Sequence, residues 1–514
     1  MTKDESNHYG VSISLKSNNT KLARINRYNN KSLFRLITLS SILIYIICSV
    51  LFFKPGHASL SLSTKQPVVG SPPYLTLDNG KTKINDAIDL VTFSFKDDKG
   101  ITYTLHKSTN TTTPEKPFIL PYSSVKTFAD LDFPMLSGFN PNSLEKYADY
   151  RYLFHLDDYR LDDYFHDDDG DKVTSKRGTI ELQFLRKWPN NSHSLFFTHE
   201  INPCEEYYKI VVAIHPYQFE TQYGYPKETS SSKPKGEGDS FYVRAEPSEP
   251  YLCWAAPNLV YSNDDIHRSS QWDNEKGFFL QDINEPAKNF PTVGAHGLFF
   301  DLIMAGALSK DVSYTKQPSD SNISLDLSLK ENENSHLKKL NVKLVGPKDG
   351  VSKTNASVKP TTFIIYAGTE KKVPIYSFTI SKWFILKPGL GEGYESSKAY
   401  CNNIGYQIPS VSDLTNANKD SEPYWLKGLL GQGNRYQRII GGGLLAEWGE
   451  ILQNYYQNLP IIIKSPIYDF WAREEIKYMD SLWRAYFVVS DKIRGSISYN
   501  YDNSEIPRAI CVSP

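Results

Sequence analysis

The stretch "AYCNNIGYQIPSVSDLTNA", residues 399–417, carries the local signals that decide the fold of the C-terminal part of this chain. Cys401 lies on a first short amphipathic helix, which Gly405 ends. Ser410 precedes Asp413 by three positions, which is a variant of the capping box at a helix start. The stretch therefore predicts two short helices. The second helix would bury a stripe made of Val411, Leu414 and Ala417.

Short runs rich in aromatic and β-branched residues follow these two predicted helices. They are "RIIGGGLLAEWGEI", "YDFWARE", "RAYFVVSDKIRGSISYN" and "AICV", and we expect short strands in them. The triple glycine at 441–443 is interpreted as a bend before one of the strands. Trp448 and Trp471 are expected to fill the core. Residues 385–514 therefore predict a compact α+β module.

The chain before residue 385 predicts β structure throughout. Residues 59–125 form a polar lead-in with one hairpin, "FSFKDDKGITYTL". Residues 126–255 and 256–384 are each predicted as an immunoglobulin-like β-sandwich, because short strands recur between turn signals. In "ISLDLSL", residues 323–329, apolar and polar residues alternate as in a strand with one face in water. The predicted fold class is mainly β.

The composition argues against a nucleic-acid partner. The 514-residue chain carries 57 Lys and Arg against 58 Asp and Glu, so it lacks the basic excess that neutralises phosphate backbones. It has 34 tyrosines against 4 methionines, with 30 glycines and 30 prolines, which is typical of a β-rich and turn-rich protein outside the cytoplasm.

The N-terminus predicts export. Basic residues precede the apolar run Leu36–Phe53, and small residues follow at Gly56 and Ala58. This pattern predicts a secretory signal in residues 1–58, with cleavage after Ala58. The apolar run is also long enough to span a bilayer as an uncleaved anchor. Under both interpretations the rest of the chain lies outside the cytoplasm.

Four cysteines lie outside the export segment, where an oxidising compartment favours disulfides. They are Cys204, Cys253, Cys401 and Cys511. Three connectivities are possible for four cysteines. The predicted module boundaries favour Cys204–Cys253 and Cys401–Cys511, because each pair then stays inside one module.

The sequence contains no motif that assigns a catalytic activity. HExxH, GxSxG and the P-loop are missing, so we expect a protein that is not an enzyme and uses no cofactor. The acidic run "HLDDYRLDDYFHDDDGD", residues 155–171, could bind calcium, but EF-hand spacing fails and a solvated acidic turn is favoured. His193, His199 and His215 show no metal-ligand pattern. No metal site is therefore predicted.

Five stretches of the C-terminal module occur in an order that points to a known family. They are "AYCNNIGYQIPSVSDLTNA", "AEWGE" at 446–450, "FW" at 470–471, "YFVV" at 486–489 and the terminal "CV". This order resembles the C-type-lectin-like domain of the intimin and invasin family of bacterial adhesins. Upstream, "NFPTVGAHGLFFDL" resembles modules of secreted relatives, the Zir-type exoproteins. The family's outer-membrane barrel has no counterpart here, so the resemblance implies a secreted or surface-exposed protein of a Gram-negative bacterium.

The resemblance also carries expectations about structure and partners. In such a fold Cys401 lies on the first helix and Cys511 on the last strand, so their bridge clamps the two ends of the module. "EPY" at 422–424 departs from the Glu-Pro-Asn triplet with which sugar-binding C-type lectins hold calcium. The resemblance therefore implies adhesion through a protein-binding surface, with a protein receptor or an outer-membrane export partner.

We expect that surface on exposed loops of the 419–440 segment. Tyr, Trp and Arg are the side chains that protein interfaces favour as anchors. The predicted anchors are Trp425, Arg435, Tyr436 and Arg438. Two other interpretations remain open at this point, namely a single-pass membrane-anchored lectin-like receptor and an extracellular hydrolase without a recognisable motif.

Overall fold

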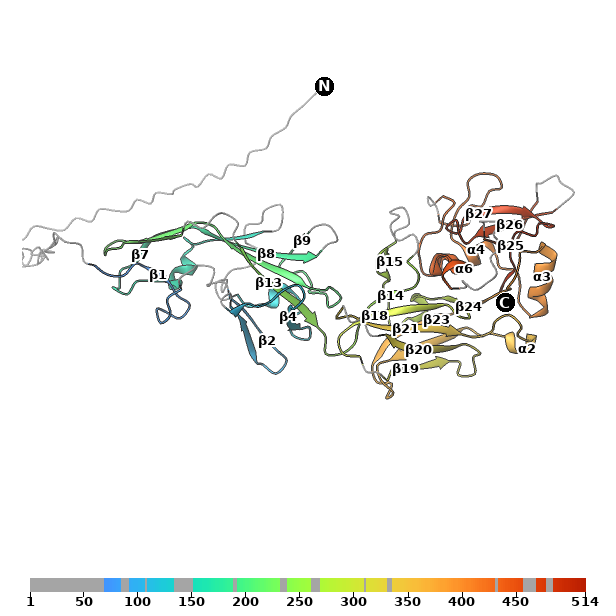
Figure 1. The fold of residues 1–514 in the computed structure, drawn as a ribbon, viewed down its shortest axis with the longest axis horizontal. Coiled ribbons are helices and arrows are strands. Elements are labelled where there is room, and N and C mark those ends of the chain that lie inside the picture. Colours follow the sequence, from blue (N-terminus) through green and yellow to red (C-terminus); the bar gives the residue numbers. More distant parts are fainter. Residues whose placement is uncertain are drawn as a thin grey trace, which may run out of the picture. The chain divides into compact units, whose positions relative to one another are not determined.

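The computed structural model describes residues 69–84, 92–106, 109–133, 151–187, 192–231, 238–259, 269–308, 311–330, 335–429, 433–455, 468–477 and 484–514. The predicted export segment lies outside these residues. The described part is mainly β, as predicted (Figure 1). It contains two large hydrophobic cores, one formed within residues 75–245 and the other within residues 255–512.

The first module is built on a six-stranded sheet in the order β4-β13-β10-β8-β5, with β9 paired to β8. These strands are β4 (Phe118–Pro121), β5 (Tyr152–His155), β8 (Thr179–Lys187), β9 (Ser192–Leu195), β10 (Tyr208–Ile214) and β13 (Gly238–Glu246). A three-stranded sheet, β12-β11-β7, adds β7 (Val173–Arg177), β11 (Tyr217–Thr221) and β12 (Glu228–Ser231). The parallel pairing of β4 with β13 departs from immunoglobulin topology, so this module is β-rich as predicted but connected differently.

The described part of the predicted lead-in belongs to this first module. Strands β1 (Tyr74–Leu75) and β6 (Phe165–His166) pair with each other, and β2 (Phe93–Lys96) and β3 (Thr102–Leu105) form the predicted hairpin. Phe93 packs edge to face on Phe241 of β13, with ring centroids 5.3 Å apart. The lead-in thus completes the core of the module, which also contains the short 3₁₀ helices η3 (Phe128–Asp130) and η6 (Tyr159–Tyr164).

The next region has the topology of a constant-type immunoglobulin sandwich. One sheet orders β14-β18-β21-β20 and the other β19-β22-β23, which correspond to strands A, B, E, D and C, F, G. The strands are β14 (Tyr251–Ala256), β18 (Phe299–Ala305), β19 (Ser313–Gln317), β20 (Ser324–Lys330), β21 (Lys338–Val345), β22 (Thr361–Tyr366) and β23 (Pro374–Ile380). Strand β14 begins before the predicted boundary at residue 256.

Smaller elements complete this sandwich. The strands β15 (Trp272–Asp273) and β16 (Gly277–Phe278) extend the first sheet beyond β14. The helices are α2 (Lys353–Ala356) and η8 (Pro286–Lys288). Along β20, Leu325 is buried and Asp326 is exposed, which follows the predicted alternation.

The C-terminal module combines four short helices with two three-stranded sheets (Figure 1). The helices are α3 (Tyr394–Asn403), α4 (Val411–Leu414), α5 (Leu444–Trp448) and α6 (Ile451–Asn454). One sheet contains β17 (Val293–Ala295), β24 (Lys382–Leu386) and β28 (Ile510–Val512), and the other β25 (Asp469–Ile476), β26 (Ala485–Ser490) and β27 (Ile497–Tyr501). Because β24 pairs antiparallel with β28, the beginning and the end of the module are neighbours.

The predicted signals in residues 399–417 act as expected. Asp413 donates its backbone N–H to Ser410 Oγ at 3.1 Å, and Ser410 donates its N–H to the Asp413 carboxylate at 2.8 Å. This reciprocal capping box starts α4. Helix α3 ends before Gly405, whose φ of +80° suits glycine. Local sequence therefore determines both helix boundaries.

The interpretation of the triple glycine at 441–443 is wrong. These residues precede helix α5 and not a strand, and Gly443 is its N-cap with φ of 99°. The sequence Leu444–Trp448 contains Leu, Ala and Glu, which favour helix, and the glycines supply the positive φ for the turn into it. Trp448 and Trp471 are fully buried, as expected.

Candidate binding surface

Both predicted disulfides are present in the structure, Cys204–Cys253 and Cys401–Cys511. The second joins α3 to β28, as the resemblance implies. The first disulfide joins the loop before β10 to strand β14, and therefore links the first module to the immunoglobulin-like sandwich. The sequence analysis predicted instead that this bridge stays inside one module. The ring of His336 lies beside it, with Nε2 3.0 Å from the Pro203 carbonyl oxygen.

Three of the four predicted anchors are not available as surface contacts. The side chains of Trp425, Tyr436 and Arg438 are 6%, 1% and 1% exposed, whereas Arg435 is exposed. The prediction that all four form an exposed surface is therefore wrong. The physical reason is that their partners come from elements distant in the sequence, and the same residue types fill cores as well as interfaces.

Arg438 connects the C-terminal module to the immunoglobulin-like sandwich. Its Nη2 donates to the carbonyl oxygens of Asn258 at 3.1 Å and of Glu447 at 2.9 Å. The guanidinium lies 4.1 Å from the centroid of the Trp272 ring. Burial lowers the pKa of Arg438. This residue is thus a structural tie between the two regions.

Glu447 forms a second buried tie that the sequence analysis missed. Its carboxylate accepts hydrogen bonds from Thr292 N at 2.8 Å, from Thr292 Oγ1 at 2.5 Å and from Gly441 N at 2.7 Å. Burial raises its pKa, and these bonds oppose the rise. The signal in the sequence was a single glutamate inside the apolar helix Leu444–Trp448. Together with Arg438, it makes the sandwich and the C-terminal module share one core.

The loop formed by residues 418–429 is held by hydrogen bonds along its length. Lys419 and Trp425 form a β-bridge, with N···O distances of 2.7 and 2.8 Å. The Asn418 side chain accepts the N–H of Gly428 at 2.8 Å and donates to the Leu429 carbonyl oxygen. The loop therefore has a fixed backbone without regular secondary structure.

The neighbouring segment is fixed in a similar way. The side chain of Asn416 accepts the Gln437 N–H at 2.9 Å and donates to the Gln437 carbonyl oxygen at 2.9 Å. The side chain of Asn434 bonds both backbone groups of Ile497. Each of these side-chain amides forms the two hydrogen bonds that a neighbouring strand would form. The Asn416 amide therefore holds its segment to that of Gln437, and the Asn434 amide holds its segment to that of Ile497.

The 418–429 loop exposes two large side chains. Tyr424 is 55% and Leu426 is 61% exposed, while Pro423 and Trp425 before and between them are buried. Trp425 packs edge to face on Phe487 of β26, with ring centroids 5.3 Å apart. The buried residues anchor the loop and the exposed residues are presented to solvent. This loop is the candidate binding surface.

Two further buried carboxylates of this module, those of Asp469 and Asp491, have raised pKa values. Asp491 accepts hydrogen bonds from Ile451 N at 2.8 Å and Leu452 N at 3.0 Å, and so caps the start of α6. Burial raises its pKa to about 7, with a smaller contribution from Glu450. Burial also raises the pKa of Asp469 to about 6. Both carboxyl groups therefore hold their protons to a higher pH in the folded protein than in the unfolded chain.

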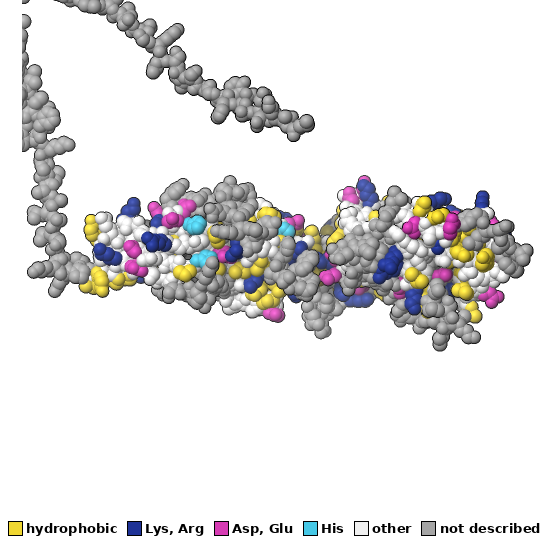
Figure 2. Space-filling model, turned by 90° about the horizontal axis from the view of Figure 1, so that it is seen from above, with side chains coloured by type: hydrophobic (Ala, Val, Ile, Leu, Met, Phe, Trp, Pro, Cys, Tyr) yellow, Lys and Arg dark blue, Asp and Glu magenta, His cyan; other side chains and the backbone are white. Residues whose placement is uncertain are grey.

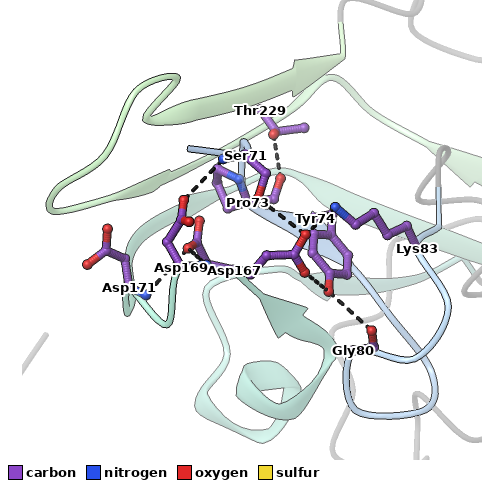
Figure 3. Close-up of polar contacts among 10 residues, drawn as sticks. Ser71, Pro73, Tyr74, Gly80, Lys83, Asp167, Asp169, Asp171 and Thr229 are labelled. Carbon is purple, nitrogen blue, oxygen red and sulfur yellow. Dashed lines mark hydrogen bonds and ion pairs between the residues drawn. The ribbon is translucent and has the colours of Figure 1, made fainter. Parts of the chain in front are cut away.

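The acidic run of the first module binds the lead-in segment (Figure 3). The Asp168 carboxylate accepts the Tyr74 hydroxyl at 2.6 Å and pairs with Lys83, and the Asp169 carboxylate accepts the Ser71 N–H at 3.1 Å. Burial and the neighbouring Asp168 raise the pKa of Tyr74 to about 12. The run therefore acts as an attachment point for residues 69–84.

The structure gives this acidic run no ligand set for a metal. A hollow of about 210 Å³ lies beside it, but the Asp162 carboxylate on its wall is paired with Lys176, and Asp167 accepts the backbone N–H of Asp169 at 2.9 Å. Within the described ranges no group of three or more His, Cys, Asp and Glu is placed to hold a metal ion.

His215 Nε2 lies 3.2 Å from a Glu181 carboxylate oxygen.

The face in Figure 2 shows Lys and Arg side chains interspersed with Asp and Glu, with hydrophobic side chains between them. On this face charges of one sign are not gathered into a single patch. Across the residues that the structure describes, no helix combines the length and apolar character that crossing a bilayer requires.

Comparison with known proteins gives little further guidance. No family model and no curated protein matches the chain. A solved structure that it resembles is the NMR representative structure of Intimin-190 from enteropathogenic E. coli. That similarity covers 44% of this chain and 90% of the other at 14% identity, with a TM-score of 0.22.

Proposed function

We propose that this chain is an extracellular, adhesin-like binding protein and not an enzyme, and that it binds a protein receptor through the 418–429 loop. The observation that carries the proposal is the exposed pair Tyr424 and Leu426 on a loop whose backbone is bonded on both sides. A fixed backbone lowers the conformational entropy that is lost when exposed side chains are buried in a complex.

The expected location of the protein supports a receptor outside the cell. The export segment in residues 1–58 and the four cysteines favour a location outside the cytoplasm. The resemblance to the intimin and invasin family implies display at the surface of a Gram-negative bacterium or release into the medium. The mixed charges of the visible face suit a protein surface better than a polyanion (Figure 2). An outer-membrane export partner would use the same loop, and the test below separates it from a receptor on another cell.

The experiment is a cell-binding titration with the exported chain carrying a fluorescent label. We compare the native protein with the double variant Tyr424→Ala/Leu426→Ala. Fully burying each such side chain contributes roughly 1.5–3 kcal/mol to binding. Losing part of both contributions should raise the protein concentration needed for half-saturation at least about tenfold. The matched control is Leu390→Ala/Ile506→Ala, which removes side chains of 58% and 52% exposure from other loops of the same module.

The outcomes separate the competing functions. Saturable binding that is lost in the first variant, kept in the control and abolished by protease treatment of the target cells supports the proposal. Binding only to the producing bacterium would indicate an export partner instead. Binding that needs calcium and is competed by free sugars would overturn it, as would turnover of peptide or glycan substrates.

A further inference from the structure

The turn between β11 and β12 exposes two aromatic rings. We call residues 222–227 the hairpin tip. Tyr223 is 62% and Tyr225 is 58% exposed, and they lie on either side of Gly224. Exposed apolar side chains that are scattered singly need no explanation, whereas neighbouring ones mark a contact surface. The hairpin tip is therefore a candidate for a contact outside the first module.

The hairpin tip has a fixed backbone. Thr221 is 5% exposed and donates its N–H to the Lys227 carbonyl oxygen at 2.9 Å and its hydroxyl to the Tyr223 carbonyl oxygen at 2.9 Å. Gly224 has a φ of +91°, which suits glycine. Because the turn is closed by these bonds, little conformational entropy is lost when the exposed rings make a contact.

The chain enters the first module beside the hairpin tip. Gly70 donates its N–H to the Tyr225 carbonyl oxygen at 3.0 Å, and the preceding Val69 is 80% exposed. Farther along, the Thr229 hydroxyl donates to the Pro73 carbonyl oxygen (Figure 3). These bonds fasten the entering chain along β12, so the entry point and the two exposed tyrosines lie at the same end of the module.

The sequence before this entry point brings a membrane within reach. The apolar run Leu36–Phe53 is predicted to lie in a bilayer, either until cleavage or permanently. Residues 54–68 connect it to Val69, and a segment of this length spans at most about 55 Å. Such a tether gives the bilayer a high effective concentration at the hairpin tip, so even a weak contact is populated.

We propose that Tyr223, Tyr225 and Val69 form a membrane-contact surface, and that its occupant is the headgroup layer of the bilayer that holds the chain's own N-terminal segment. Tyrosine is favoured at this depth because its ring is apolar while its hydroxyl reaches water. The contact belongs to the membrane-attached chain and holds the first module at the bilayer. It goes beyond the receptor binding proposed for the 418–429 loop and does not depend on it.

The charges around the hairpin tip indicate the kind of lipid. Lys172 and Lys227 are exposed there, and an added Cβ at Gly224 would come within 3.3 Å of a carboxylate oxygen of Asp171. Since both signs of charge border the rings, attraction to anionic lipid is offset by repulsion. We therefore expect contact with zwitterionic lipid, driven by burial of the rings and insensitive to salt.

The test is a fluorescence measurement on the full chain, inserted through its N-terminal segment in phosphatidylcholine vesicles. The environment-sensitive dye NBD is attached to Gln222→Cys, an exposed tip position, in a Cys48→Ser background because the other four cysteines are in disulfides. We expect nitroxide-labelled headgroups to quench this dye at low and high salt alike. The dye on Lys372→Cys, between β22 and β23, should not be quenched.

Paired variants separate a specific contact from tethering alone. Tyr223→Ser/Tyr225→Ser should abolish the quenching at the hairpin tip. The matched control Ile101→Ser/Tyr103→Ser removes side chains of 51% and 39% exposure from the β2–β3 hairpin of the same module, and should leave the quenching unchanged.

Three results would overturn the surface. They are a tip dye that is not quenched in the native chain, quenching that persists in the tyrosine double variant, and equal quenching at positions 222 and 372. The last two would show that the tether alone keeps the chain near lipid. No receptor takes part in the measurement, so failure here is distinct from failure of the proposed function.

Discussion

The buried Asp491 should make the C-terminal module more stable at acidic than at neutral pH. Aspartate in an unfolded chain has an ordinary pKa of 3.8, and burial raises that of Asp491 to about 7. The folded state therefore binds more protons than the unfolded state between these values. Stability is full below pH 4, falls as the pH rises toward 7, and is level above that. A difference of roughly 3 pKa units corresponds to about 4 kcal/mol.

The substitution Asp491→Asn isolates this contribution. The amide keeps one acceptor oxygen but places an NH₂ group where the second carboxylate oxygen accepts, so the hydrogen bond from either Ile451 N–H or Leu452 N–H is lost. The lost bond lowers the stability of the variant by a constant amount at every pH. Relative to the native protein, the variant should gain up to about 4 kcal/mol of stability between pH 4.5 and pH 8, because only the native protein must take the buried proton off Asp491. The other buried acids contribute equally to both proteins, so they cancel in the difference.

The assay is urea unfolding of both proteins at several pH values, followed by tryptophan fluorescence. Seven of the eight tryptophans lie beyond residue 250, so the signal reports the sandwich and the C-terminal module. Exposed Asp420→Asn is the control and should change nothing. A stability difference between Asp491→Asn and the native protein that stays constant from pH 4.5 to 8 would refute the reasoning.

Three further changes test the local arguments. Breaking Cys401–Cys511 by alanine substitution, which opens a separation of 110 residues, should lower the unfolding free energy by about 5 kcal/mol in urea titrations; an unchanged midpoint would contradict the loop-closure argument. Ser410→Ala should lose about 1 kcal/mol in thermal unfolding, because Asp413 N–H loses its cap; a melting temperature equal to that of the native protein would count against the capping box. Gly428→Ala would bring a Cβ to 2.1 Å from the Ala417 carbonyl oxygen, so we expect amide exchange in the 418–429 loop to quicken; exchange rates equal to those of the native protein would contradict this close approach.

The parts of the fold that the sequence predicts are those with local causes. The capping box of Ser410 and Asp413 and the alternation in residues 323–329 depend on neighbours a few positions away. Each therefore appears in the structure as predicted. The helix Leu444–Trp448 was missed because the triple glycine before it signals a turn equally well before a strand or a helix.

The candidate site was predicted less well because burial depends on distant residues. Arg438 looks like an interface anchor in the sequence, but its guanidinium bonds the Asn258 carbonyl oxygen, 180 positions away. Trp425 was selected for the same reason and is likewise buried. The exposed Tyr424 and Leu426 are its direct neighbours in the chain. The residues at 423–426 are Pro, Tyr, Trp and Leu, which show no alternation of apolar and polar types, so the sequence gives no signal for which of them are exposed.

The order of the 418–429 loop follows from the chemistry of asparagine. A carboxamide carries a donor and an acceptor, so it can pair with both backbone groups of a neighbouring residue as a strand does. Asn416 does this with Gln437, and Asn434 does it with Ile497. Asn418 accepts the N–H of Gly428 and donates to the carbonyl oxygen of Leu429. Aspartate at any of these positions would lose the donor and leave a carbonyl oxygen unpaired. A chain can therefore fix an irregular loop through side-chain amides, with the side chains of Tyr424 and Leu426 exposed to solvent.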